Sequence, residues 1–282
     1  DGVNLHQINV TGCHISYNRL GGIRIERSEV RNLQITGNDI EYNNARVHPD
    51  FPDAPTAEIW IDTTARGASV NEVTVASNTI QATVSPGGAN LRILEAPGTD
   101  RPPGLWTING NVIGSQERNV WITGGHGITL TGNTIYSAAR ENLLLEDSDQ
   151  VVVQGNHFRR HTPTMGTGVA IVRSRDVTLG GVTVRDESET GQESGLPPLR
   201  IEDADGVLVQ GGAFIDGVPF GIDVARSRHV RLSNVSVRER RATRRATGSI
   251  RFRGPGENNQ IAYCDVDAPH QLDPESAVTF LP

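Results

Sequence analysis

The stretch that decides the fold is Leu33–Ile40, LQITGNDI, because variants of it recur along the whole chain. Each copy alternates apolar and polar residues, turns at a Gly-Asn pair or its equivalent, and ends on an apolar residue. Ten copies follow one another at spacings of 22 to 40 residues, at Ile8–Ile15, Leu33–Ile40, Val73–Ile80, Trp106–Ile113, Ile128–Ile135, Val151–Phe158, Val177–Val184, Val207–Phe214, Val230–Val237 and Asn259–Val266. Such a period is typical of a protein built of stacked repeats.

A third extended segment follows each copy, with two apolar residues flanking a middle one. The ten segments are Ile23–Ile25, Ile59–Ile61, Leu91–Ile93, Val120–Ile122, Leu143–Leu145, Val169–Ile171, Leu199–Ile201, Ile222–Val224, Ile250–Phe252 and Val278–Phe280. Alternation of this kind, on β-branched anchors, predicts strands, and no window shows the spacing of an amphipathic helix. We therefore predict an all-β parallel β-helix, a solenoid of about ten coils, as a single domain over residues 1–282.

One turn position carries asparagine in five successive copies: Asn38, Asn78, Asn111, Asn133 and Asn156. Asparagine tolerates the backbone of a tight bend, and its amide both donates and accepts hydrogen bonds. We expect these side chains to form an internal ladder from coil to coil. Later copies replace the asparagine with Val182, Gly212, Val235 and Cys264, which predicts an apolar stack there.

The ladder, the three-strand coil and the repeated Gly-Asn frame resemble the right-handed parallel β-helix superfamily. This superfamily includes pectate lyases, related polysaccharide lyases and hydrolases, and carbohydrate-binding repeat proteins. The resemblance covers essentially the whole chain and implies a secreted, extracellular or cell-surface protein that acts on a polysaccharide. The local catalytic signatures of pectate lyases and polygalacturonases are missing from the sequence, so the resemblance implies an architecture shared by several activities.

Composition limits the partners of the chain. A net charge of -7 and a pI near 5.6 give no reason to expect a nucleic acid. No apolar run reaches the ~18 residues of a membrane span, so we expect no membrane insertion, and no signal segment is present. The chain opens directly on a repeat, from which we expect that its native N-terminal cap is missing. The sequence leaves the assembly state undetermined.

The two cysteines, Cys13 and Cys264, take the same position in the first and last copies. About nine layers separate the two residues, and stacked layers lie ~4.8 Å apart, so their Cα atoms are several tens of ångströms apart. A disulfide requires Cα atoms within about 7 Å. We therefore predict two free thiols.

Long loops predict where a binding groove lies. The loops at 41–58, 62–72 and 95–104 flank both edges of the third strands in coils two to four. Surface loops on a rigid scaffold are common places for functional sites. We expect a groove there, with the outward residues of the third strands as its floor.

Two rows of outward side chains cross this floor. The stacking predicts that Glu26 and Asp62 lie side by side, flanked by Arg24, Trp60 and Arg92. The same pattern predicts that Trp60 and Trp121 are exposed, and an exposed indole offers a flat apolar face to a sugar ring. Arg24, Trp60 and Trp121 are therefore the candidate substrate-binding residues.

Several chemistries suit this cluster. Glu26 and Asp62 could form the carboxyl pair of a retaining glycoside hydrolase. In a polysaccharide lyase, Glu26, Asp62, Asp50 and Asp53 could hold Ca²⁺, which neutralises a uronate carboxylate while a base removes the adjacent proton. All 26 basic residues are arginine, so Arg92, Arg24 or His48 would have to be that base.

Other interpretations need no catalysis, or a different one. The arginines and tryptophans could bind an acidic glycan without reaction, as a binding or adhesion module. A uronan C5-epimerase would share the proton abstraction of a lyase. The charged residues could also form an ordinary cross-strand salt-bridge ladder on a solvated face. His126, in a short turn, is better explained as a turn residue than as a catalytic one.

Overall fold

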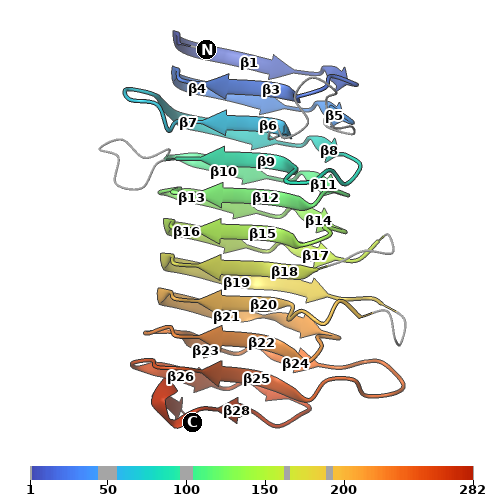
Figure 1. Ribbon diagram of the computed structural model, residues 1–282, viewed down its shortest axis with the longest axis vertical. Coiled ribbons are helices and arrows are strands. Elements are labelled where there is room, and N and C mark those ends of the chain that lie inside the picture. Colours follow the sequence, from blue (N-terminus) through green and yellow to red (C-terminus); the bar gives the residue numbers. More distant parts are fainter. Residues whose placement is uncertain (1, 44–55, 96–103, 162–165, 189–192, 282) are drawn as a thin grey trace.

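The protein is a right-handed parallel β-helix, seen in a computed structural model that describes residues 2–43, 56–95, 104–161, 166–188 and 193–281. Its strands stack one above another along the long axis (Figure 1). Strand pairing is parallel throughout, and the one helical element in these ranges is a 3-10 turn, Pro274–Ser276. The described residues contain no helix long and apolar enough to cross a membrane.

The repeat frames form one 19-stranded sheet, here called sheet A. Its first strand in each coil carries the alternating apolar residues that point into the core. These strands are β1 (Asn4–Thr11), β4 (Glu29–Thr36), β7 (Ser69–Ala76), β10 (Trp106–Asn109), β13 (Ile128–Thr131), β16 (Asp149–Gln154), β19 (Arg175–Arg185), β21 (Asp205–Ile215), β23 (Arg231–Ser233), β26 (Asn259–Ala262) and β29 (Val278–Leu281).

A short second strand follows the turn of each frame. These strands are β2 (His14–Ser16), β5 (Asp39–Glu41), β8 (Thr79–Gln81), β11 (Val112–Gly114), β14 (Thr134–Tyr136), β17 (His157–Arg159), β24 (Ser236–Arg238) and β27 (Asp265–Val266). In two coils the turn is continuous with both strands, so that β19 and β21 each run through it. The predicted ten copies of the frame are thus confirmed.

The third segments form a ten-stranded sheet, here called sheet B. Its strands are β3 (Gly21–Glu26), β6 (Ala57–Asp62), β9 (Ala89–Leu94), β12 (Arg118–Thr123), β15 (Glu141–Glu146), β18 (Thr167–Val172), β20 (Leu199–Glu202), β22 (Phe220–Ala225), β25 (Gly248–Arg253) and β28 (Gln271–Leu272). The predicted register is confirmed, because Ile25, Ile61, Ile93 and Ile122 are successive Cα partners.

One predicted strand of sheet B is wrong. The segment Val278–Phe280 belongs to β29, which pairs with β26 in sheet A, and the last strand of sheet B is β28, which pairs with β25. The 3-10 turn before Val278 carries the chain around a further corner, so this segment begins a new coil. The described residues therefore make about nine full coils, slightly fewer than the predicted ten.

The core is a continuous stack of aliphatic side chains between the sheets. Leu33, Ile35, Ile61 and Ile80 are at most 1% exposed, and they belong to one cluster that runs through the coils. Burial of one such side chain contributes roughly 1.5 to 3 kcal/mol relative to an exposed position. The outward side chains therefore stand on a rigid support.

The predicted asparagine ladder is present. The Nδ2 atoms of Asn38, Asn78, Asn111 and Asn133 donate to the Oδ1 of the next asparagine over 2.8–3.0 Å. Each Oδ1 also accepts the backbone N–H of the asparagine before it, so the buried amides satisfy one another. Beyond Asn156 the corner is apolar, with Val182 and Val235 buried as expected.

A second ladder, at the entry to sheet B, was not foreseen. Asn90 donates to Asn119 over 2.8 Å, and Asn119 donates to Asn142 over 2.7 Å. Asn90 and Asn119 also donate to backbone carbonyls of the second strands that follow in the next coil, at Gly114 and Tyr136. The bonds fix where each strand of sheet B begins and so where its outward residues stand.

The predicted free thiols are confirmed. Cys13 is exposed, Cys264 is half-buried, and both are unpaired. Burial raises the pKa of the Cys264 thiol, and backbone hydrogen bonds at Val235 and Ala262 oppose the shift in part. The shift favours the protonated thiol over the nucleophilic thiolate.

Candidate functional site

The candidate site lies on the outer face of β3, β6, β9 and β12. On neighbouring rungs Arg24 is the partner of Trp60, Trp60 of Arg92, and Arg92 of Trp121. The predicted walls of the groove fall largely on 44–55 and 96–103, outside the described residues. The floor can therefore be described in detail.

The carboxylates of Glu26 and Asp62 stand on adjacent rungs, as the register predicts. Glu26 forms an ion pair with Arg24, two residues earlier on its own strand. The Oδ1 atom of Asp62 accepts hydrogen bonds from the backbone and the hydroxyl of Thr64, over 2.9 and 2.7 Å. Each carboxylate is thus oriented by its own coil, and each keeps part of its surface open to solvent.

Trp60 is not the exposed residue that the alternation predicts. It is 5% exposed and packs against Ala57 and Ala89, with Leu94 and Trp121 beside it. The guanidinium of Arg24 lies 5.0 Å from the centre of its ring. Its buried Nε1 atom has no hydrogen-bond partner among the described residues. Small side chains on its own strand, at Ala57, and on the neighbouring β9, at Ala89, make room for the indole, which is thereby buried.

Trp121 is half-buried, and two guanidinium groups lie over its ring. The guanidinium of Arg92 lies 3.9 Å from the ring centre and that of Arg118 lies 4.3 Å from it. The indole Nε1 donates to Glu146 on β15 over 2.7 Å. The prediction of an open indole face is therefore corrected: the buried side chains of Arg92 and Arg118 cover much of the ring that Trp121 was expected to offer.

Arg92, one of the two arginines over the Trp121 ring, is buried, at 5% exposure. Its guanidinium donates to the backbone carbonyls of Ile93 and Trp121 over 2.5 and 3.2 Å. Burial lowers the pKa of Arg92 to about 10; Arg118 adds to the shift, and Glu146 and Asp62 oppose it. About one molecule in a thousand carries a neutral Arg92 at pH 7.

Arg118 was not among the site residues predicted from the sequence. The alternation places Trp121 outward, and Arg118 precedes it by three residues at the corner where Asn119 enters the second ladder. The corner turns Arg118 onto the outer face, where it pairs with Glu141 over 2.9 Å. Arg118 and Glu141 occupy the same position in successive copies, and this opposite-charge pairing was the available signal.

The calcium hypothesis is tested only in part by the described residues. His48, Asp50 and Asp53 lie outside them, so their positions relative to Glu26 and Asp62 stay predictions. Within the described ranges no third carboxylate or imidazole joins Glu26 and Asp62 in a ligand group. These two residues alone give fewer than the 6–8 oxygen ligands that Ca²⁺ takes, so the site would need water, substrate or the 44–55 loop.

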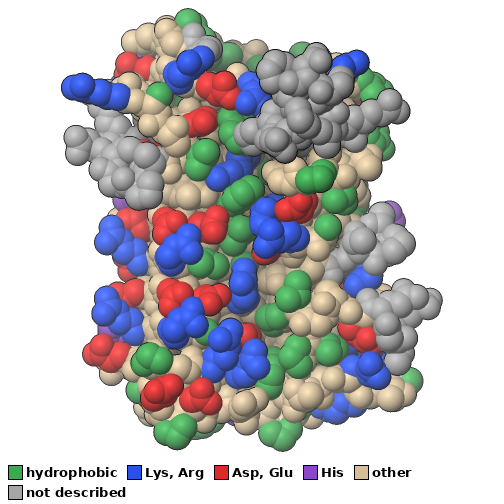
Figure 2. All heavy atoms as spheres, viewed as in Figure 1, with side chains coloured by type: hydrophobic (Ala, Val, Ile, Leu, Met, Phe, Trp, Pro, Cys, Tyr) green, Lys and Arg blue, Asp and Glu red, His purple; other side chains and the backbone are tan. Residues whose placement is uncertain are grey.

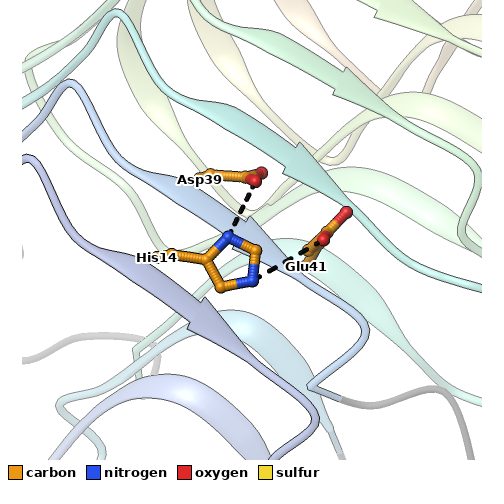
Figure 3. A group of neighbouring side chains, drawn as sticks. All are labelled: His14, Asp39 and Glu41. Atoms are coloured by element: carbon orange, nitrogen blue, oxygen red, sulfur yellow. Dashed lines mark hydrogen bonds and ion pairs between the residues drawn. The ribbon is translucent and has the colours of Figure 1, made fainter.

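A different group of ligand-type side chains is present on the second strands of sheet A. His14, Asp39 and Glu41 bring one ligand atom each within 4.8 Å of one another, and Figure 3 shows the imidazole between the two carboxylates. The ring nitrogens already bond to Asp39 over 3.0 Å and to Ser16 over 2.8 Å. The group is explained as a hydrogen-bonded surface cluster.

The same face looks different farther along the helix. There, oppositely charged side chains pair directly across rungs, as in Glu146 with Arg173 and Glu202 with Arg226. Figure 2 shows acidic and basic side chains alternating over the lower part of this view. Asp223 is buried, and burial raises its pKa, but hydrogen bonds from Arg251 and Arg253 outweigh this and hold the pKa below its usual range.

Comparison with solved structures defines the class of the protein as a parallel β-helix. Full-length tailspike protein 2 from an Escherichia coli O157:H7 bacteriophage matches 93% of this chain at a TM-score of 0.55 and 11% identity. The enzymatically active domain of tailspike protein 2 from bacteriophage CBA120 matches 93% at 0.53, also with 11% identity. This chain covers 39% and 43% of those two chains.

A bacterial protein shares the architecture too. PfbA, a surface adhesin of Streptococcus pneumoniae, matches 93% of this chain and is covered over 76% of its own length, at a TM-score of 0.51 and 9% identity. No protein-family description and no curated protein sequence matches the chain. At these identities the likeness shows the fold alone.

Proposed function

We propose that this protein is an extracellular or cell-surface, carbohydrate-active β-helix. In this proposal it binds a uronate-containing polysaccharide over β3 to β12 and cleaves it as a lyase or a glycoside hydrolase. The observation that carries the proposal is that two carboxylates, Glu26 and Asp62, stand on adjacent rungs beside a row of stacked guanidinium and indole groups.

The stacked row suits an anionic sugar chain. Arg24, Arg92 and Arg118 supply three guanidinium groups along the helix axis, and each lies over an indole that holds it in place. A guanidinium recognises a carboxylate through parallel hydrogen bonds. Trp60 and Trp121 then act as supports for the arginines, and the half-buried Trp121 also contributes apolar edge to the floor.

A hydrolase would use the two carboxylates directly. Adjacent strands are ~4.8 Å apart, close to the 5–5.5 Å that separates the carboxyl groups of retaining glycoside hydrolases. Glu26, which is held in place by its ion pair with Arg24, would be the nucleophile. Asp62, which accepts bonds from Thr64, would be the proton donor to the leaving oxygen.

A lyase would use the same residues differently. Glu26 and Asp62, with Asp50 and Asp53, would hold Ca²⁺, and the cation would neutralise the uronate carboxylate. The base would be Arg92, whose lowered pKa is a step toward that role, or His48. A uronan C5-epimerase would begin with the same proton abstraction and return the proton to the opposite face of the ring.

A non-catalytic binding or adhesion module is the second candidate. It is favoured by the ion pair between Arg24 and Glu26, which occupies one of the two carboxylates. The solved structures that share the fold support both candidates, since one is described as an enzymatically active tailspike domain and another as a surface adhesin. The proposed partner in either case is a polysaccharide, without nucleic acid or membrane insertion.

The deciding experiment measures products. The protein is incubated with alginate, pectate and other acidic glycans, with added Ca²⁺ or with a chelator. Unsaturated products identify a lyase, and new reducing ends without unsaturation identify a hydrolase. Exchange of the C5 proton, followed by NMR, identifies an epimerase. Binding without any of these identifies a module, and the absence of both binding and reaction contradicts the proposal.

Matched variants locate the activity. Glu26→Gln and Asp62→Asn remove charge from the proposed site with little change of shape. Glu202→Gln is the control, because Glu202 occupies the same outward column on β20 but pairs with Arg200 and Arg226. Loss of activity or binding in the first two variants and not in the control supports the site; equal behaviour of all three means that the site lies elsewhere.

A further inference from the structure

A second hollow lies at the corner where the strands of sheet B end and those of sheet A begin, at the left in Figure 1. Its volume is about 530 Å³, within the range of ligand sites. It extends along the axis across five successive coils and is lined by Arg31, Ser69, Asn71, Gly104, Leu105, His126, Gly127 and Gln150. This surface is separate from the outer face of sheet B.

His126 is held in this wall in a defined orientation. Its Nδ1 atom lies 2.5 Å from the Oδ1 of Asp149, and the Oδ2 of Asp149 accepts a bond from Arg175 over 2.9 Å. Burial raises the pKa of Asp149, but the bonds from His126 and Arg175 outweigh this and place the pKa below its usual range. Asp149 is therefore a carboxylate at neutral pH, and its contact with Nδ1 selects the imidazole tautomer that carries its proton on Nδ1.

The Nε2 atom of His126 is then a hydrogen-bond acceptor. Within the described ranges it has no hydrogen-bond partner, and the side chain is 39% exposed at the edge of the hollow. A bound hydroxyl group could donate to this atom. The carboxylate behind the ring would strengthen that bond, because the hydrogen bond at Nδ1 polarises the imidazole toward Nε2.

Two other histidines provide an internal comparison. His14 and His229 also place Nδ1 against a carboxylate, at 3.0 Å from Asp39 and 2.7 Å from Asp205. In both, a neighbour covers Nε2: Ser16 lies 2.8 Å from that of His14, and Asn258 lies 3.4 Å from that of His229. Of these three pairs, the one that lines the hollow is the one with its acceptor open.

The remaining walls indicate the kind of ligand. Arg31 is the one arginine among the described lining residues, and it carries a positive charge. Asn71 accepts a bond from the backbone of Gly104 through its Oδ1 atom, which leaves its amide N–H groups to donate. Leu105 is 68% exposed and adds an apolar surface beside these polar groups. Mixed apolar, cationic and amide groups along an extended trough suit a chain of hydroxyl-bearing, negatively charged sugars.

We propose that this hollow is a second binding site for an anionic saccharide chain. Arg31 pairs with an acidic group of the sugar, and the Nε2 atom of His126 accepts a sugar hydroxyl. The site does not depend on the proposed reaction at sheet B. A chain held at both surfaces would dissociate more slowly than one held at a single surface.

The test is an NMR titration of the histidine side chains with uronate oligosaccharides. We expect the resonances of His126 to move and those of His229 to stay. His126→Ala and Arg31→Ala should each lower the affinity of this site about tenfold. The matched controls His229→Ala and Arg231→Ala remove an imidazole paired with Asp205 and an exposed sheet A arginine away from the hollow, and they should leave the affinity unchanged.

Other outcomes overturn the inference. Stationary His126 resonances at saturating oligosaccharide would show that the hollow is not a saccharide site, even if the sheet B face is active. Equal affinity for neutral oligosaccharides would contradict the role of Arg31. Repeating the titration on Trp121→Ala separates the two surfaces: His126 should still respond when the sheet B site is damaged.

Discussion

The N-terminal half of the helix, up to residue 161, and the C-terminal half, from residue 166, use the same coil with different chemistry. The N-terminal half turns its corners on bonded asparagines and covers sheet B with arginines stacked on indoles. The C-terminal half turns on Val182 and Val235 and covers sheet B with arginines paired to carboxylates.

The difference separates two uses of arginine. A guanidinium bonded to a carboxylate, such as Arg251 with Asp223, has its charge neutralised on the spot. Stacking on an indole leaves a guanidinium its net charge, because the ring carries no charge of its own. Arg92 is the example in the N-terminal half, since it bonds to backbone carbonyls and to no carboxylate among the described residues, whereas Arg24 and Arg118 also pair with Glu26 and Glu141. The stacked half therefore holds one unneutralised guanidinium beside paired ones, and the paired half holds its coils together through ion pairs.

The largest effect is expected in the corner of the N-terminal half. Asn111→Ala removes the acceptor of the Asn78 side chain and the donor to the carbonyl of Val75. These buried groups are then left unsatisfied, which should cost about 3 kcal/mol of unfolding free energy in a urea titration. Asn109→Ala, at the end of β10 just before this turn, is the control and should change stability by less than about 0.5 kcal/mol. Equal effects would mean that the ladder contributes little.

A smaller loss is expected where the C-terminal half pairs its charges. Asp223→Ala leaves Arg251 and Arg253 without the buried carboxylate, and should cost about 2 kcal/mol in the same measurement. Glu26→Ala breaks a pair that is partly open to solvent, and should cost less than about 1 kcal/mol. A larger loss for Glu26→Ala would reverse the contrast between the two halves.

Acid should weaken the C-terminal contact in a defined direction. The folded protein holds the pKa of Asp223 below its unfolded value, so this carboxylate stabilises the fold above about pH 4 and the contribution is lost as the pH falls through the folded pKa. Urea midpoints measured between pH 7 and pH 2 should therefore fall more steeply for the parent than for Asp223→Ala. Parallel curves would remove Asp223 from the acid sensitivity.

Binding should distinguish the halves as well. Trp121→Ala removes the ring that supports Arg92 and Arg118, and should weaken uronate binding about tenfold in calorimetry. Val172→Ala, an outward substitution on β18, is the control for general damage to the face. If both variants bind as the parent does, the stacked row is not the glycan surface.

The smallest effect is expected from alkali. Arg92 has a pKa of about 10, so at pH 10 about half of the molecules have lost this charge and the affinity for a uronate should be about twofold lower. If Arg92 is instead the base of a lyase, the rate should rise about tenfold for each pH unit below 10. Activity and binding measured between pH 7 and pH 10 thus assign its role.

The fold could be predicted from the sequence because each coil repeats the same local rule. Residues such as Ile35 and Ile61 are buried by alternation alone, and Asn78 and Asn111 are fixed by their turn. The burial of Trp60 could not be predicted from the same rule, because it depends on the small side chains of Ala57 on its own strand and Ala89 on the neighbouring strand. The position of Arg118 depends on how the chain turns a corner, which alternation does not describe.

The coil count and the second ladder show the same limit. Val278–Phe280 has the composition of a sheet B strand, yet the preceding 3-10 turn places it in sheet A. Asn90, Asn119 and Asn142 occupy the second position of their strands, a regularity that becomes visible once the coils are aligned. The sequence pattern therefore predicts which residues form a strand. The conformation of the corners, which the pattern does not predict, determines the sheet that the strand joins and the direction of its side chains.

The stacking of coils also determines how unfolding would spread along the helix. In this helix each rung bonds to the rungs directly before and after it, as β9 does to β6 and β12. Such a chain of nearest neighbours loses order one unit at a time from an end, and the middle keeps its shape while the ends fray. A parallel β-helix of this kind could gain or lose whole coils during evolution, and the coils far from the change would keep their structure.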